Sequence, residues 1–243
     1  MTIADLAAHF PALDSQTPVL IAGPTACGKS RLALQIAKTF GGVVINADAI
    51  QVYGALQILT ARPSMEDERQ VQHLLYGHIT FDHAYSVGQW LREVTPLLHG
   101  GERPIIIGGT GLYFQALTQG LAEIPQISPQ IIARSEQVLA NAGHTALITE
   151  LDAATAARID LHNPMRVQRA WQVLHSTGRG LADWQDATPP PMLRVADSIP
   201  IVFNVARDWL NQRIATRFES MIAEGALDEL SLIHISEPTR RRG

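Results

Sequence analysis

The strongest chemical signal in the sequence is a glycine-rich stretch near its start. It matches the pattern G-x-x-x-x-G-K-[ST] and consists of Gly23, Pro24, Thr25, Ala26, Cys27, Gly28, Lys29 and Ser30. In such a loop, backbone N–H groups and the positive end of the next helix surround a polyphosphate. Lys29 adds a positive charge, and the Ser30 hydroxyl is suited to hold Mg²⁺. We therefore expect a diphosphate or nucleotide site here.

A carboxylate follows the next predicted strand, which covers residues 43–48 and ends at Asp48. Strands joined through one helix are parallel and share a carboxyl edge, so Asp48 is expected beside the glycine-rich loop. From position alone, Asp48 is a proton acceptor or a helix N-cap. The apolar run 103–107 predicts a third strand, and Thr110 in the glycine-rich turn after it can cap a helix, bind substrate or do both.

The segments around these residues predict how they are held. The apolar run 19–22 is typical of a buried strand, and helical spacing follows the loop up to Phe40. Together the runs predict an α/β fold, a P-loop NTPase-like parallel sheet flanked by helices, with a helical insertion. We assign 1–120 and 199–230 to the catalytic core, 121–180 to the insertion and 181–198 to a linker. Strand patterns are absent from the insertion, which carries Arg158, Arg166, Arg169 and Arg179.

The last predicted helix begins near Arg207. Apolar residues predict a buried stripe along it, and Arg213 and Arg217 share another face from which they can bind a pyrophosphate; the stripe consists of Leu210, Ile214, Phe218, Met221 and Ile222. The helical pattern ends near Ser231, and we interpret 231–243 as a non-native tail.

The composition restricts the class of protein. The chain has 243 residues, a formal charge of −4 and one cysteine. A nucleic-acid partner must therefore meet a local basic patch, and the single cysteine fits a reducing compartment. No apolar stretch is long enough to cross a bilayer, and no secretory signal pattern is found at the start. We expect a cytoplasmic protein with no membrane partner.

Several motifs in fixed order resemble those of the bacterial tRNA dimethylallyltransferases. Besides the glycine-rich loop, they are residues 48–53 (DAIQVY), 60–63 (TARP), 85–87 (YSV), 108–113 (GGTGLY), 163–170 (NPMRVQRA), 177–178 (TG) and 213–218 (RIATRF). The resemblance implies transfer of a dimethylallyl group from dimethylallyl diphosphate to the exocyclic N6 amine of the adenosine 3′ of the anticodon. The tRNAs concerned read codons that begin with U, and diphosphate is released.

The resemblance also implies roles for individual residues. Asp48 is the general base and Thr110 lies at the reacting centre. The glycine-rich loop (Gly23 to Ser30, with Mg²⁺ on Ser30), Arg213 and Arg217 hold the diphosphate. The helical insertion grips the anticodon stem-loop. Independently of the resemblance, we expect the protein to be a monomer. The residues that face the tRNA are Asp48, Ala49, Ile50, Gln51, Thr110, Met165, Arg166, Val167, Gln168 and Arg169.

Some positions depart from the family pattern. Cys27 and Ala49 each stand where the family usually has Ser, and Ile132 stands where many members have an Arg that contacts tRNA. Two other classes fit the glycine-rich loop taken alone. A small-molecule or nucleoside kinase also places an acid after its second strand, and a nucleotide-dependent switch shares the loop. The switch interpretation lacks guanine-reading or metal-binding acidic motifs.

Overall fold

The computed structural model describes residues 17–236, with side chains up to Ser231. The chain divides into two compact units. The first, which we call the core unit, comprises Met1–Thr118 and Met192–Gly243, and the second, the helical unit, comprises Gln119–Pro191. The first 16 residues of the expected core and the last seven of the expected tail lie outside the described residues.

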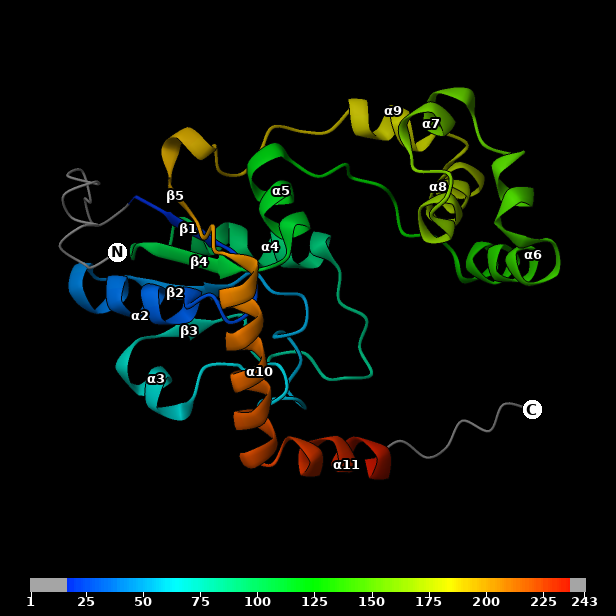
Figure 1. Ribbon diagram of the computed structural model, residues 1–243. Coiled ribbons are helices and arrows are strands. Elements are labelled where there is room, and N and C mark those ends of the chain that lie inside the picture. Colours follow the sequence, from blue (N-terminus) through cyan, green and yellow to red (C-terminus); the bar gives the residue numbers. More distant parts are fainter. Residues whose placement is uncertain (1–16, 237–243) are drawn as a thin grey trace. The chain divides into compact units, whose positions relative to one another are not determined.

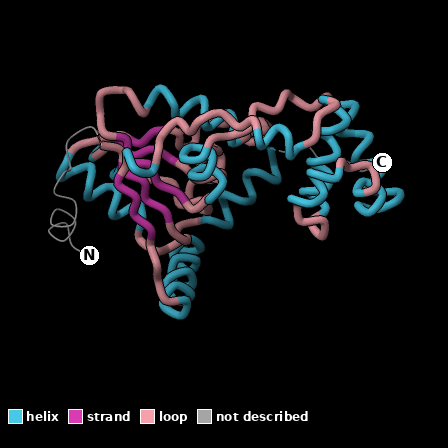
Figure 2. The backbone as a smooth tube through the Cα atoms, turned by 90° about the horizontal axis from the view of Figure 1, so that it is seen from above, coloured by secondary structure: helices cyan, strands magenta, loops and turns pink. Residues whose placement is uncertain are grey.

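The core unit is built on one parallel sheet. Its strands are β1 (Val19–Ala22), β2 (Val43–Asn46), β3 (His73–Leu74), β4 (Pro104–Gly108) and β5 (Ile199–Val202), in the order β3-β2-β4-β1-β5. β1 pairs with both β4 and β5, with Ile21 opposite Ile107 and Ile201. Figure 2 shows the strands as one twisted sheet with helices beside it. This arrangement confirms the predicted fold class.

Helices cover the sheet and carry its connections (Figure 1). They are α2 (Lys29–Phe40), α3 (Met65–Gln70), α4 (Val87–Leu97) and α5 (Gly111–Gln119). The apolar side of α2 is buried against the strands, with Ala33 and Ile36 packed in the same cluster as Val19 and Ile105. α4 begins with a capping box, because the Ser86 side chain accepts from the Gln89 N–H and the Gln89 side chain accepts from the Ser86 N–H.

Two short elements between β2 and α4 were not predicted. The short helix α3 begins at a capping box formed by Ser64 and Asp67, and β3 has only two residues. Neither is long enough to show a hydrophobic period. β3 nevertheless extends the sheet beyond β2, with His73 paired to Val44.

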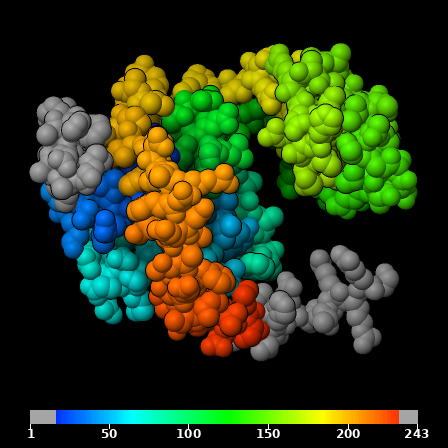
Figure 3. Space-filling view, in the orientation of Figure 1, coloured from blue at the N-terminus to red at the C-terminus, as the bar shows by residue number. Residues whose placement is uncertain are grey.

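The last two helices are α10 (Arg207–Ala223) and α11 (Ala226–Ser236), orange and red in Figures 1 and 3. The predicted buried stripe on α10 is wrong, because none of its residues is buried and Phe218 is 59% exposed. α11 continues through residues 231–236, so the helical pattern does not end at Ser231 as expected.

The helical unit contains α6 (Pro129–Ile148), α7 (Ala153–Arg158), α8 (Pro164–Thr177) and α9 (Leu181–Asp186). α6 bends at Gly143, whose φ of 73° lies outside the helical region. Asn163 precedes α8 and its side chain caps the first turn, and Gly178 follows the helix in the left-handed conformation. Leu147, Val167 and Trp171 form the unit's buried core.

The stretch 181–198, expected to be a linker, is partly ordered into secondary structure. Its first six residues form α9, which packs on α7 through an ion pair between Arg158 and Asp186. Its end forms a 3₁₀ turn, η1 (Val195–Asp197), before β5. The irregular part is therefore shorter than the proline-rich sequence suggested.

Candidate active site

The glycine-rich loop connects β1 to α2 and is held by its own backbone geometry. Gly28 has a φ of 99°, a conformation that residues with a side chain rarely adopt. A Cβ on Gly23 would lie 2.7 Å from the Phe203 Cβ, so the backbone approaches its neighbour too closely for another residue. The Lys29 Nζ donates to the Pro24 carbonyl at 2.7 Å, which folds the lysine back over the loop.

A cavity of about 590 Å³ opens beside this loop within the core unit. Its lining includes Gly28, Lys29 and Ser30 from the loop and first turn of α2. The charged residues of the wall are mostly positive: Lys29, Arg31, Arg62, Arg213 and Arg217. None of these described cations has a carboxylate within ion-pair distance. The one acid in the wall, Asp67, accepts hydrogen bonds from Ser64 instead. Such a wall suits a multiply charged anion.

Arg213 and Arg217 reach the glycine-rich loop from α10. The Arg213 Nε donates to the Ala26 carbonyl at 2.9 Å, and an Arg217 nitrogen lies 3.5 Å from the Thr25 hydroxyl. Their spacing of four residues puts both on the helix face that borders the cavity. The structure thus brings together the loop and the two arginines that the sequence pattern paired with it.

The pKa values of two of these cations reflect the desolvated site. Burial lowers the pKa of Lys29 from its ordinary value, and the nearby Arg217 charge lowers it further, whereas Cys27 and Asp48 act in the opposite direction. Burial also lowers the pKa of Arg217, and the Asp48 charge opposes that effect. A bound anion would offset the desolvation cost of both cations.

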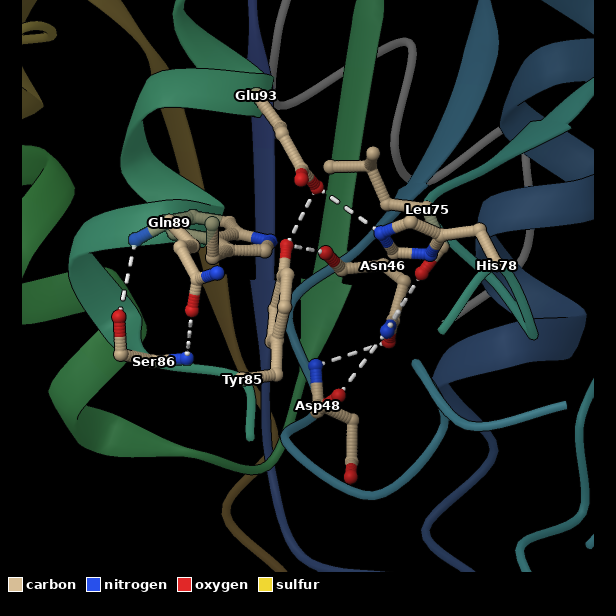
Figure 4. A network of polar contacts seen from close by, with 9 residues as sticks. Asn46, Asp48, Leu75, His78, Tyr85, Ser86, Gln89 and Glu93 are labelled. Carbon is tan, nitrogen blue, oxygen red and sulfur yellow. Dashed lines mark hydrogen bonds and ion pairs between the residues drawn. The ribbon is translucent and has the colours of Figure 1, made fainter. Parts of the chain in front are cut away.

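Asp48 follows β2 and is held in place by Asn46. The Asn46 side chain accepts from the Asp48 N–H at 2.8 Å and donates to the Asp48 and Leu75 carbonyls, each at 3.0 Å. The Asp48 carboxylate accepts from the Ile50 N–H at 2.9 Å. Asn46 is fully buried. Figure 4 shows it between Leu75 and Asp48. The sequence analysis missed this residue, although an Asn two positions before an Asp is typical of a side chain that turns the backbone.

Thr110 joins the Asp48 loop to the turn after β4. Its hydroxyl accepts from the Ala49 N–H at 3.3 Å. A Cβ on Gly109 would lie 3.4 Å from the Gly23 carbonyl and 3.9 Å from an Asp48 carboxylate oxygen. The carboxyl ends of β1, β2 and β4 therefore bring the glycine-rich loop, Asp48 and Thr110 to one place.

Behind Asp48, a polar network ties α4 to this edge of the sheet (Figure 4). The Glu93 carboxylate accepts from the Tyr85 hydroxyl at 2.6 Å and lies 2.9 Å from the His78 Nε2. The Trp90 indole donates to the Asn46 carbonyl at 2.6 Å. Through Trp90, α4 supports the residue that holds Asp48. None of these supporting residues was assigned a role from the sequence, except that Tyr85 belongs to one of the motifs.

The other residues expected to face tRNA in the core unit divide into two kinds. Ile50 is 60% exposed and Ala49 is partly exposed, so both are accessible. The Gln51 amide donates to the carbonyls of Thr60 and Ala61, at 2.7 and 3.0 Å, so this side chain braces a turn of the protein. The Gln51 amide is therefore engaged within the protein, and the expected contact of Gln51 with the nucleic acid stays a prediction.

In the helical unit, α8 carries the second expected tRNA-facing group. Met165, Arg166 and Arg169 are exposed at the surface of the unit. The side chains of Val167 and Gln168 are buried instead, and the Gln168 amide donates to the Ser135 hydroxyl at 3.0 Å. Because a helix turns by 100° per residue, five successive side chains cannot all face one partner. Val167 and Gln168 are therefore corrected to core positions.

Comparison with known proteins identifies the family. The family model described as "IPP transferase" matches residues 51–241, and the one described as "Isopentenyl transferase" matches residues 17–78. A tRNA dimethylallyltransferase of Cereibacter sphaeroides is 55% identical over 91% of this chain and 70% of its own length. One of a Ruegeria species is 55% identical over 89% of this chain and 74% of its own length.

Solved structures show the same fold. A tRNA isopentenylpyrophosphate transferase from Bacillus halodurans is 30% identical, with a TM-score of 0.58, and the match covers 90% of this chain and 70% of that one. A eukaryotic dimethylallyltransferase acting on tRNA has a TM-score of 0.76 at 24% identity, and the chain spans 56% of it. These likenesses decide against the kinase and the nucleotide switch. The chain belongs to the IPP transferase family, whose curated relatives are tRNA dimethylallyltransferases.

Proposed function

We propose that this chain transfers a dimethylallyl group from dimethylallyl diphosphate to the exocyclic N6 amine of the adenosine 3′ of the anticodon in a tRNA. The observation that carries the proposal is the meeting of Asp48 and Thr110 with the glycine-rich loop at one edge of the sheet. A carboxylate and a phosphate cradle side by side suit the attack of a nucleophile on a carbon that bears a diphosphate.

The leaving group accounts for the positive cavity. As the C1–O bond of the donor breaks, its electron pair stays on the diphosphate, whose negative charge increases. Groups that are preorganised around that charge stabilise the transition state more than the ground state. The groups that can stabilise this charge in the chain are the loop N–H groups, Lys29, Arg213 and Arg217.

The attacking amine requires a base. An exocyclic adenine nitrogen is weakly nucleophilic, because its lone pair is delocalised into the ring. We propose that the Asp48 carboxylate takes the amine proton as the new N–C bond forms. Thr110, which borders Asp48, would position the amine by a hydrogen bond. The adenosine must leave its stack to reach these groups, as other bases that undergo chemistry do.

A magnesium ion fits the same cradle. Ser30 is exposed and lines the cavity, and Mg²⁺ often takes only one or two protein ligands while substrate phosphates and water supply the rest. We propose that Ser30 holds Mg²⁺, which would neutralise part of the charge on the bound diphosphate. The proton transfer and the positioning of the amine are left to Asp48 and Thr110.

The helical unit is proposed to bind the anticodon stem-loop. Arg166 and Arg169 lie one turn apart near the start of α8 and are exposed, and partial desolvation of the Arg169 guanidinium lowers its pKa. Phosphate oxygens would compensate this partial desolvation. A tRNA substrate agrees with a cytoplasmic enzyme.

The test offers labelled dimethylallyl diphosphate to the full-length protein, together with unmodified tRNA or with a tRNA that lacks adenosine at the target position. Label in the first tRNA alone, recovered as N6-dimethylallyladenosine after digestion, is the expected result. An assay with γ-labelled ATP and small acceptors runs in parallel. Label passing from ATP to an acceptor, with none from the prenyl donor to tRNA, would overturn the proposal in favour of phosphoryl transfer.

A further inference from the structure

Residues 57–62 form a turn that overlaps the sequence motif at 60–63 and that brings Arg62 to the wall of the cavity. We call it the 57–62 turn. The Glu229 carboxylate on α11 accepts from three successive backbone N–H groups of this turn, at 2.5 Å from Gln57, 2.9 Å from Ile58 and 2.9 Å from Leu59. Three N–H groups that converge on one carboxylate form an anion-binding nest. The contact joins parts of the core unit about 170 residues apart.

The other end of the turn is held by Gln51, whose amide donates to the carbonyls of Thr60 and Ala61. Within the turn, the Ala61 N–H donates to the Ile58 carbonyl at 2.9 Å and the Arg62 N–H donates to the Gln57 carbonyl at 3.1 Å. Ala61 has a φ of 50°, a conformation that needs support from its surroundings. Glu229 and Gln51 therefore fix the turn from its two ends.

The 57–62 turn places Arg62 at the cavity. Its side chain lines the same wall as Lys29 and Arg217. One Arg62 nitrogen donates to the Gly54 carbonyl at 2.9 Å, and the guanidinium packs over Gly77, where a Cβ would overlap it. Its Nε is buried and has no hydrogen-bond partner among the described residues. The orientation of Arg62 thus depends on the backbone around it, while its charge has no acidic partner in the described chain.

From these contacts we propose that Glu229 is a positioning residue, which fixes the 57–62 turn and thereby holds the Arg62 guanidinium on the wall of the cavity as a further cation for the diphosphate. The inference deepens the proposed function, on which it rests for the identity of the anion. Glu229 does not line the cavity beside the glycine-rich loop, so it acts through Arg62. Without it, three N–H groups lose their acceptor and the turn can rearrange.

The experiment compares the full-length protein with Arg62→Ala, Glu229→Ala, Glu229→Gln and the double variant Arg62→Ala/Glu229→Ala. Binding of inorganic pyrophosphate is measured by calorimetry, and KM and kcat are measured for the prenyl donor at saturating tRNA. We expect each alanine variant to raise the pyrophosphate Kd and the donor KM roughly tenfold, the effect of losing one charge-assisted hydrogen bond. The Glu229→Gln side chain keeps an acceptor oxygen and should recover most of the affinity.

Two matched controls separate positioning from general damage. Arg69→Ala removes an exposed arginine on the neighbouring α3, and Glu219→Ala removes an exposed acid on α10; both should leave pyrophosphate binding unchanged. Because Glu229 acts through Arg62, the double variant should be no weaker than Arg62→Ala alone. Additive losses, or an unchanged pyrophosphate Kd in Arg62→Ala, would overturn the inference. A wild-type protein that binds pyrophosphate but transfers no prenyl group would contradict the proposed function instead.

Discussion

Asn46 holds the backbone of Asp48 from both sides, accepting from its N–H at 2.8 Å and donating to its carbonyl at 3.0 Å. Among the described residues, the carboxylate itself accepts one backbone hydrogen bond, from the Ile50 N–H. The backbone is therefore fixed while the side chain retains acceptor capacity for a substrate proton. A general base at the end of a strand requires this arrangement, because its position must be fixed while its carboxylate oxygens stay able to accept a proton.

Asp48→Asn should abolish transfer while leaving binding intact. Asparagine has the same shape and keeps an oxygen for the Ile50 N–H, but it cannot accept the amine proton. Loss of a general base lowers kcat by roughly 10²–10⁴-fold. Single-turnover transfer to unmodified tRNA measures the loss, and filter binding of tRNA together with pyrophosphate calorimetry should show changes of only a few-fold. A variant with the wild-type rate would remove Asp48 from the mechanism.

Asn46→Ala should lower both stability and kcat. It leaves the partly buried Leu75 carbonyl without this donor, which costs about 1 kcal/mol of the free energy of unfolding. It also frees the Asp48 backbone, so kcat should fall at least roughly tenfold, because small misplacements of a reacting group are costly. Asn46 does not line the cavity, so the donor KM should stay near the wild-type value. Denaturant unfolding and steady-state kinetics separate the two effects, and a stability loss with unchanged kcat would make Asn46 purely structural.

The site could be predicted from the sequence because its residues follow local patterns of apolar runs and helical spacing. The glycine-rich loop, Asp48 and Thr110 each follow a buried apolar run, and parallel strands align their carboxyl ends whatever the details of packing. Arg213 and Arg217 were found because four-residue spacing puts them on one helix face. The supporting contacts were not predictable in the same way. Asn46 to Leu75 and Glu229 to the 57–62 turn join residues distant in sequence, and no local period encodes them.

The errors have equally specific causes. The apolar stripe of α10 has the spacing of a buried face, but spacing cannot tell whether any element covers it, and Phe218 is 59% exposed. On α8, a contiguous motif suggested that five residues face one partner, whereas helical geometry turns Val167 and Gln168 inward. The two-residue strand β3 is too short to show any pattern.

Arg166→Ala combined with Arg169→Ala should weaken tRNA binding in a manner that depends on salt. Each arginine that no longer binds a phosphate should reduce the slope of log K against log[salt] by about one. Arg158→Ala is the matched control in the same unit, because Asp186 already neutralises Arg158 through a bidentate pair at 2.6 and 2.9 Å. Titrations at several salt concentrations measure the slopes. Equal slopes for the double variant and the wild type would place Arg166 and Arg169 on an ordinary solvated surface.

Gly108→Ala should destabilise the core unit strongly. Its Cβ would lie 2.1 Å from the Ala47 carbonyl oxygen and 2.5 Å from the carbonyl carbon, so the backbone of β4 must separate from the Asp48 loop. We expect a loss of about 2 kcal/mol or more in the free energy of unfolding. Gly111→Ala is the control, since nothing lies within 4 Å of its Cβ, and it should change stability by less than about 1 kcal/mol. Urea unfolding of both variants measures the difference, and similar stabilities would contradict the close approach of Gly108 to Ala47.

Tyr113→Phe should reduce the decline in the free energy of unfolding at high pH. Tyr113 stacks on Trp90 with ring centroids 4.8 Å apart, and burial, with the nearby Tyr53 and Asp48, raises its pKa from 10.0 to about 12. Because the folded-state pKa is raised, the neutral phenol contributes stability in full below pH 10 and loses it as the pH rises towards 12. Phenylalanine keeps the ring but cannot ionise, so its unfolding free energy should decline less than that of the wild type over this interval. Urea titrations at steps between pH 9 and 12 measure the two curves. Parallel curves would mean that the Tyr113 phenol ionises as readily in the folded chain as in the unfolded one.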